Sequence, residues 1–162
     1  MINDKLAIVL YTSTKGHFGY KDCYKHTVER MEKEIPFFNS FTKVAHIKYS
    51  EKDGEEQLVE MESFLNEKGF FVEITQGDWQ HNNESHANGY YRDMLTALSK
   101  PCLHKFPYVF AVEDDWQLSF NNKFSLAVSE ALSYLDKDLN MLCVRVNRDT
   151  HNNVEQSSKI TN

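Results

Sequence analysis

The chain has 162 residues, of which 41% are hydrophobic and 26% are charged, and its formal net charge is −6. This length and composition predict a single ordinary globular domain that buries a core of its own. The acidic balance, with no basic stripe, argues against binding along a nucleic-acid backbone, and no apolar stretch reaches the roughly 20 residues of a membrane span.

Cysteine usage and the first residues indicate the expected compartment. Cys23, Cys102 and Cys143 fall inside expected helices or strands, do not pair by number and lack zinc-like spacing, which is typical of reduced thiols. Residues 1–5 lead directly into an apolar run and have no signal-peptide design. We therefore expect a cytoplasmic protein with no transmembrane segment.

Hydrophobic periodicity predicts strands and helices that alternate along the chain. The continuous apolar run at 6–11 indicates a central strand, whereas the alternation at 44–49 indicates a half-exposed strand near an edge. The expected strands span residues 6–11, 44–49, 70–75, 108–112 and 141–146. Helices are expected at 24–35, from a capping box at Asp53 and Glu56 to Gly69, from about His86 to Pro101, and from Asn121 or Asn122 to Leu135.

The spacing of the strands predicts the fold class. Successive strands lie roughly 30 residues apart with a helix between them, which argues for an α/β three-layer sandwich with a mostly parallel central sheet and helices on both faces. We expect one domain over residues 1–150 and a polar tail over residues 151–162. In such folds ligands bind beyond the carboxyl ends of the strands, where neighbouring crossovers leave in opposite directions.

Three adjacent acids, Glu113, Asp114 and Asp115, follow the apolar run at 108–112. Carboxylates this close repel one another unless a proton or a cation intervenes, and Mg²⁺ and Mn²⁺ prefer carboxylate oxygens. Because side chains alternate along a strand, Glu113 and Asp115 should point together as metal ligands. Asp114 is then left to bind ribose hydroxyls, or to accept the metal if the strand twists as it ends. The alternative is a strand that ends in a solvated acidic turn.

The loop after the first expected strand carries Thr12, Ser13 and Thr14, which offer hydroxyl groups and backbone N–H donors. If the first and fourth strands are neighbours at the switch point, this loop and the acids line one crevice. Such a pairing suits a nucleotide diphosphate bridged by a cation. Arg92 offers a charged fork to a phosphate, and the alternative for this residue is an exposed ion pair on its helix.

The order of these motifs resembles the glycosyltransferases of the GT-A fold, of the large family 2 kind. Residues 113–115, after their strand, are similar to the D-x-D motif that holds Mn²⁺ or Mg²⁺ in those enzymes, with Glu in place of the first Asp. Residues 82–93 (NNESHANGYYRD) resemble the Asn/Gly-rich loop and helix upstream of that motif, and residues 11–13 (YTS) correspond to the loop that meets the base. The resemblance covers most of residues 5–150.

This resemblance implies a set of binding residues and a function. It puts Asp53 where an acidic residue often contacts the base or ribose, and Asn88 and Arg92 in the loop and helix upstream of the metal motif. The implied donor is a UDP- or GDP-linked sugar with Mn²⁺ or Mg²⁺ as cofactor, and the acceptor is a glycan, protein or lipid. A general base for the acceptor hydroxyl is expected late in the chain at Asp149 or His151, and His151 is alternatively a metal ligand.

Family members usually continue well past the metal motif, so the chain is interpreted as a minimal version, a fragment truncated at its C-terminus, or one domain completed by another domain or chain. The first hypothesis is a metal-dependent glycosyltransferase. The second is a catalytically incomplete nucleotide- or sugar-binding module or subunit of the same fold. A nucleotidyltransferase is the third, although residues 12–19 fit its Gly-rich signature only loosely. A receiver domain is disfavoured, because its acidic pair follows the first strand.

Overall fold

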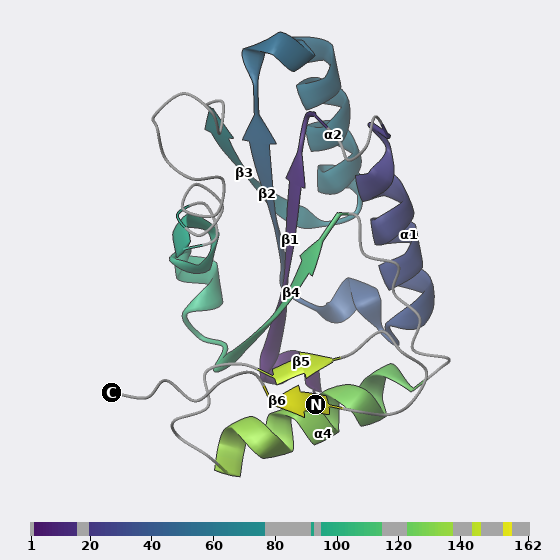
Figure 1. Cartoon of the computed structure of the whole chain (residues 1–162). Coiled ribbons are helices and arrows are strands. Elements are labelled where there is room, and N and C mark those ends of the chain that lie inside the picture. The colour runs from purple at the N-terminus through teal and green to yellow at the C-terminus, as the bar shows by residue number, and fades with distance from the viewer. Residues whose placement is uncertain are drawn as a thin grey trace.

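The computed structural model describes residues 2–15, 20–76, 92, 95–114, 123–137, 144–146 and 154–156. Its centre is a four-stranded parallel sheet in which the strands are ordered β3-β2-β1-β4 (Figure 1). The strands are β1 (Leu6–Ser13), β2 (Lys43–Tyr49), β3 (Phe70–Gln76) and β4 (Tyr108–Glu113). All four match strands expected from the sequence, and β1 continues two residues further than expected.

Helices cover both faces of this sheet. The helices α1 (Cys23–Glu34) and α2 (Glu55–Glu67) pack on one face, while the helical residues 95–98 and the 3-10 helix η4 (Pro101–Leu103) cover the other. The predicted α/β class, a three-layer arrangement with a parallel central sheet, is confirmed. The described ranges contain three further 3-10 helices: η1 (Ile2–Asp4) before β1, η2 (Phe38–Ser40) between α1 and β2, and η3 (Glu51–Asp53) between β2 and α2.

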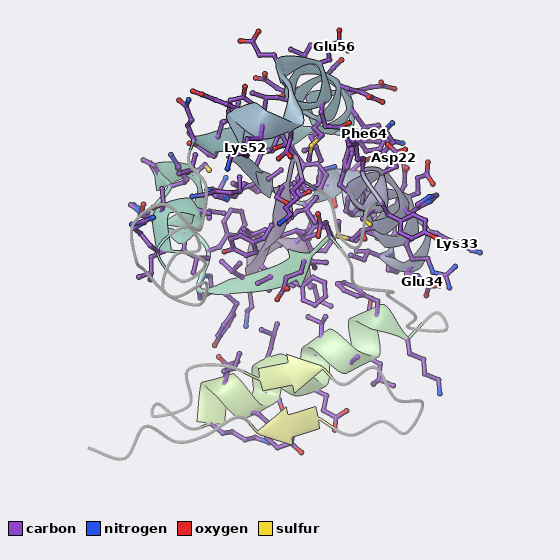
Figure 2. All side chains as sticks on the ribbon, turned by 45° about the horizontal axis from the view of Figure 1, so that its top comes forward. Asp22, Lys33, Glu34, Lys52, Glu56 and Phe64 are labelled. Carbon is purple, nitrogen blue, oxygen red and sulfur yellow. The ribbon has the colours of Figure 1, made fainter. Side chains whose placement is uncertain are left out.

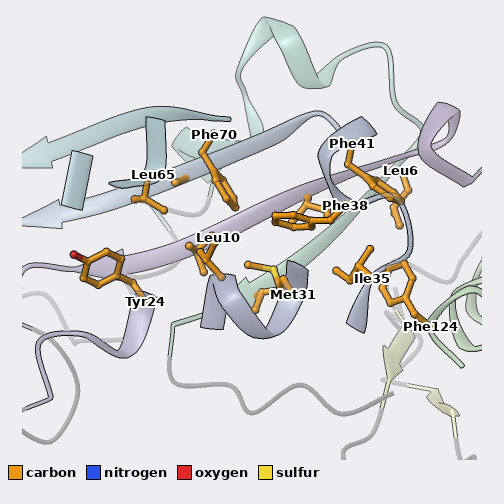
Figure 3. Packing of buried hydrophobic residues seen from close by; sticks show 14 of the residues in the cluster. Leu6, Leu10, Tyr24, Met31, Ile35, Phe38, Phe41, Leu65, Phe70 and Phe124 are labelled. Atoms are coloured by element: carbon orange, nitrogen blue, oxygen red, sulfur yellow. The ribbon is translucent and has the colours of Figure 1, made fainter. Parts of the chain in front are cut away.

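The larger core lies between the sheet and the layer formed by α1 and α2 (Figure 3). Alternate side chains of β1, namely Leu6, Ile8 and Leu10, point to this face and are at most 3% exposed. The helices contribute apolar residues at helical spacing: Tyr24, Val28 and Met31 from α1, and Met61 and Leu65 from α2. A smaller core on the opposite face contains Ala7 and Val9 of β1 together with Ala97 and Leu103. The prediction that β1 is buried on both faces is therefore confirmed.

The position of β2 differs from the prediction. It lies between β1 and β3 and is buried from Lys43 to Lys48, so the expected half-exposed position near an edge is wrong. The polar residues of β2 are buried with partners instead of facing water. The Lys43 ammonium lies 4.2 Å from the centre of the Phe38 ring, and His46 Nε2 lies 2.8 Å from Thr75 Oγ1. The polar residues that alternate with apolar ones along β2 are therefore buried side chains with partners in the interior.

The start of α2 also differs from the prediction. Gly54 is the N-cap, and no side chain caps the helix, so the capping box expected from Asp53 and Glu56 does not form. Gly54 has a φ of +87°, a backbone conformation that a residue with a Cβ atom adopts only under strain. The Asp53 carboxylate therefore does not cap α2 and accepts a hydrogen bond from Thr14 instead.

The last described elements lie apart from the sheet. α4 (Phe124–Lys137) is tied to the larger core by Phe124, whose ring meets those of Phe41 and Phe110 edge to face at centroid distances of 6.4 and 5.7 Å. β5 (Val144–Val146) pairs antiparallel with β6 (Val154–Gln156) in a separate two-stranded sheet. Residues 154–156 of the expected polar tail thus form a strand, and the described part of the fifth expected strand pairs with it instead of joining the central sheet. Among the helices of the described ranges, none has both the length and the apolar character of a membrane span.

The strand order creates a switch point beside β1. The chain moves from β1 to β2 and then to β3 on one side, whereas β4 lies on the other side of β1 and pairs Glu113 with Tyr11. The strand order therefore reverses at β1, so the carboxyl ends of β1 and β4 lie at the kind of switch point where α/β folds bind their ligands. The predicted adjacency of the first and fourth strands is confirmed.

Candidate functional site

At this switch point the carboxyl-terminal end of β1 with the residue after it (the tip, residues 12–14) contacts the acidic end of β4 directly. The Thr12 hydroxyl donates a hydrogen bond of 2.7 Å to Oδ2 of Asp114, which lies 102 residues later in the chain. The backbone N–H of Asp114 also donates to the Tyr11 carbonyl at 3.0 Å. Thr12 is only 6% exposed, so its hydroxyl would lose a hydrogen-bond partner in the interior if the acid were absent. Thr12 and Asp114 therefore join the ends of β1 and β4, which is the adjacency that the sequence analysis required.

A second threonine of the same tip holds a second aspartate. Thr14 donates from its hydroxyl to Oδ2 of Asp53 at 3.0 Å and accepts from the Ser50 backbone N–H at 3.1 Å. The Thr14 N–H is also used, because it donates to the Lys48 carbonyl at 3.0 Å. Thr14 is completely buried. This burial argues against the expected direct contact between Thr14 and a nucleotide, and makes Thr14 a support for Asp53.

Two carboxylates thus flank the tip of the central strand, Asp114 on the β4 side and Asp53 on the β2 side. Both are half-buried. Each is held by a threonine at the end of β1, Asp114 by Thr12 within the strand and Asp53 by Thr14 directly after it. The position expected for Asp53, near a nucleotide-binding loop, is therefore compatible with its location. Exposed Lys15 directly follows the tip and supplies a nearby positive charge.

Helix α1 contributes a third contact that the sequence analysis missed. The Thr27 hydroxyl donates to the backbone carbonyl of Asp114 at 2.6 Å, and Thr27 is 4% exposed. The available signal was its position: Thr27 lies among Tyr24, Val28 and Met31 on the apolar stripe of α1, where a polar residue needs a partner.

The first turn of α1 is also fastened to α2. Lys25 Nζ lies 2.9 Å from Asp22 Oδ1 and 2.5 Å from Glu60 Oε1, and these hydrogen bonds, chiefly the one to Glu60, raise the pKa of Lys25. The Tyr24 ring packs edge to face on Phe64 of α2, with ring centroids 5.5 Å apart. Asp22, just before α1, and Phe64 of α2 are labelled in Figure 2. These contacts give Thr27 a fixed platform.

Glu113 lies on the other face of the sheet from Asp114, because consecutive residues of a strand alternate. It ends a row of polar residues that are in register across the sheet, from Glu73 through His46 and Tyr11 to Glu113. The rings of Tyr11 and His46 have centroids 6.2 Å apart, and His46 is 2% exposed. The separation of Glu113 from Asp114 follows the predicted alternation.

The donor chemistry of this tip fits a hard divalent cation, because Mg²⁺ and Mn²⁺ take carboxylate oxygens. Glu113 and Asp114 are two such groups at the switch point, but they lie on opposite faces of the sheet. Within the part of the chain that the structure describes, no three His, Cys, Asp or Glu side chains form a group that could hold a metal. Asp115, the expected partner of Glu113, lies outside the described residues. The described residues therefore agree with a divalent cation only in the type of ligand atom, carboxylate oxygen, and in its position at the carboxyl edge of the sheet.

Of the remaining predicted site residues, the structure describes Ser13 and Arg92. Ser13 is the half-exposed last residue of β1 and pairs in register with Lys48 of β2. Arg92 is an exposed helical residue in the segment that covers the second face, and its carbonyl accepts a hydrogen bond from Thr96. Asn88, Asp149 and His151 lie outside the described residues.

Comparisons with known proteins add no further identification. No protein-family model matches this chain, and neither a curated protein nor a solved structure matches it.

Proposed function

We propose that this chain is the nucleotide-sugar-binding part of a metal-dependent glycosyltransferase that transfers a sugar from a UDP- or GDP-linked donor to an acceptor. The observation that carries the proposal is the 2.7 Å hydrogen bond between Thr12 and Asp114. It joins the first strand's loop to the acids at the switch point, where nucleotides bind in parallel α/β folds. The order of motifs that resembles the GT-A fold supports the same assignment.

The residues at the tip suit the parts of such a donor. Asp53 and Asp114 offer acceptor oxygens for the hydroxyls of ribose or for the N–H groups of a base. Lys15 and Arg92 are candidates for the diphosphate charge, and Glu113 with Asp115 for Mn²⁺ or Mg²⁺. A bound divalent cation would neutralise charge on the diphosphate leaving group. Asp149 remains the candidate general base for the acceptor hydroxyl.

The proposal is tested by nucleotide binding before any transfer assay. With ligand at about 100 times its dissociation constant, binding stabilises the folded protein by about 2.7 kcal/mol, which raises the melting temperature by about 5–10 °C for a domain of this size. We expect such a shift with UDP or GDP plus Mn²⁺ and a smaller shift without the metal. Asp115→Ala should abolish the metal-dependent part and leave the unliganded melting temperature within about 2 °C of the wild type.

A matched control is Asp4→Ala, which makes the same change in charge in η1, at the opposite end of β1. It should retain the full metal-dependent shift. An equal nucleotide response in Asp115→Ala and wild type would refute the metal assignment, and no response in the wild type would refute the proposed function. Binding without release of free nucleotide from UDP- or GDP-sugars would favour the alternative, a catalytically incomplete binding module.

A further inference from the structure

The outer side of α2 carries an acidic hollow that the proposed function does not use. The helix contains five glutamates and neither lysine nor arginine. A hollow of about 720 Å³ on this side is lined by Lys25 of α1 and by four of these acids, namely Glu55, Glu56, Glu60 and Glu67. Glu60 pairs with Lys25, whereas Glu55 and Glu56 form no ion pair with a residue of the described ranges. The hollow therefore carries excess negative charge, which a cationic partner would neutralise.

The same hollow also has an apolar part. Val59 lies in the middle of α2 and is 62% exposed, and the half-buried Phe64 lines the hollow further along the helix. Protein interfaces typically combine an apolar centre with a polar or charged rim. The surface therefore suits a segment that carries an apolar side chain between cationic ones.

A buried hydroxyl group beside the hollow has no acceptor. Tyr24 is 1% exposed, and its hydroxyl has no hydrogen-bond partner among the described residues. It points away from the labelled core side chains of β1 and α1 (Figure 3), and the Tyr24 ring packs on Phe64 with ring centroids 5.5 Å apart. Burial raises the pKa of Tyr24, and the main charges that act on its hydroxyl are Lys25 and Glu60, which both line the hollow. An unsatisfied buried donor costs stability, so this hydroxyl is a binding group for an acceptor that a ligand brings.

We propose that the hollow on α2 is a docking surface for a basic amphipathic segment of a partner protein. The cationic side chains of that segment pair with the glutamates of α2, and its apolar residue covers Val59. The Lys25–Glu60 ion pair is partly exposed, and such pairs contribute little to stability, so a cation of the partner can replace Lys25 at Glu60. The Tyr24 hydroxyl then donates to a backbone carbonyl of the segment. A second copy of this chain is disfavoured as the occupant, because it brings a net charge of −6.

The test measures binding of a fluorescently labelled peptide to the intact chain by anisotropy, at about 150 mM salt. The peptide has about 14 residues, with lysine on one helical face and leucine on the other. Tyr24→Phe is the decisive variant, because the hydroxyl that it removes has no partner in the free chain. We expect Tyr24→Phe to weaken peptide binding by about fivefold and to leave the melting temperature of the free chain unchanged or higher. Glu56→Gln and Val59→Ala should each weaken binding by about threefold.

Matched controls lie on α4, where Glu130→Gln removes an exposed acid and Leu126→Ala shortens a side chain that is 65% exposed. Both should bind the peptide like the wild type. Equal weakening in these controls would show that the peptide responds only to net charge and general apolar surface, and the inference would then be wrong. It is also wrong if the wild type does not bind the peptide, or if Tyr24→Phe binds it equally well. Sedimentation equilibrium of the chain alone examines the other occupant, and a dimer that Val59→Ala dissociates would overturn the basic partner.

Discussion

The hydrogen bond between Thr12 and Asp114 can be tested energetically, independently of any ligand. Thr12→Val keeps the shape of the side chain and removes the donor, so that the half-buried Asp114 carboxylate loses this hydrogen bond. Hydrogen bonds to charged groups contribute about 1.5–3 kcal/mol, and partial exposure of Asp114 reduces this value because water screens the charge. We therefore expect Thr12→Val to lower the free energy of unfolding by about 1–2 kcal/mol, or the melting temperature by about 2–8 °C.

The contribution of the bond itself is isolated by a double-mutant cycle. Thr12→Val, Asp114→Ala and the double variant are unfolded in urea, with far-ultraviolet circular dichroism as the signal. The coupling energy should be about 1–2 kcal/mol, whereas changes at independent sites add to within about 0.5 kcal/mol. Thr12→Ser is the matched control, because it keeps the hydroxyl and should keep most of the coupling. Additive effects of the two changes would refute the contact and, with it, the shared site at the tips of β1 and β4.

Two further predictions concern residues remote from the site. Burial lowers the pKa of Lys43 from 10.5, so the folded state binds this proton more weakly than the unfolded state, and stability should rise as pH increases toward 10.5. Lys43→Met should remove that rise in urea midpoints measured at increasing pH below 10.5, and an unchanged pH slope would contradict the assignment. Phe37 is 85% exposed and has a φ of +58°, so Phe37→Gly should raise the free energy of unfolding by about 0.5–1 kcal/mol. Phe37→Ala removes the ring but keeps the strain, and a gain of the same size in that variant would argue against backbone strain as the cause.

The acidic tip and the threonine loop were predictable because both depend on local sequence. Residues 6–11 form an unbroken apolar run, and such a run predicts a strand buried on both faces. The acids directly follow a second apolar run, so they must lie at the end of its strand. With parallel strands, the ends of both runs come to the same edge of the sheet. Only the adjacency of β1 and β4 had to be assumed, and the strand order confirms it.

The errors arose where partners are distant in the sequence. The pattern of β2 was interpreted as a strand with one wet face, but Lys43 lies against the ring of Phe38, and His46 pairs with Thr75 of β3. Asp53 has the spacing of a helix cap, yet its carboxylate accepts from Thr14, which lies 39 residues earlier. A periodic pattern shows which side chains share a face. It does not show what covers that face.

The sequence by itself determined the alternation of strands and helices, the buried central strand and the acids at a strand end, because each follows from periodicity and chain direction over a few residues. Only the tertiary structure decided which carboxylates are held and by what. Thr12, Thr14 and Thr27 reach Asp114 or Asp53 across 39 to 102 residues of chain. Such pairings depend on which elements become neighbours when the core closes, and no local pattern records that choice.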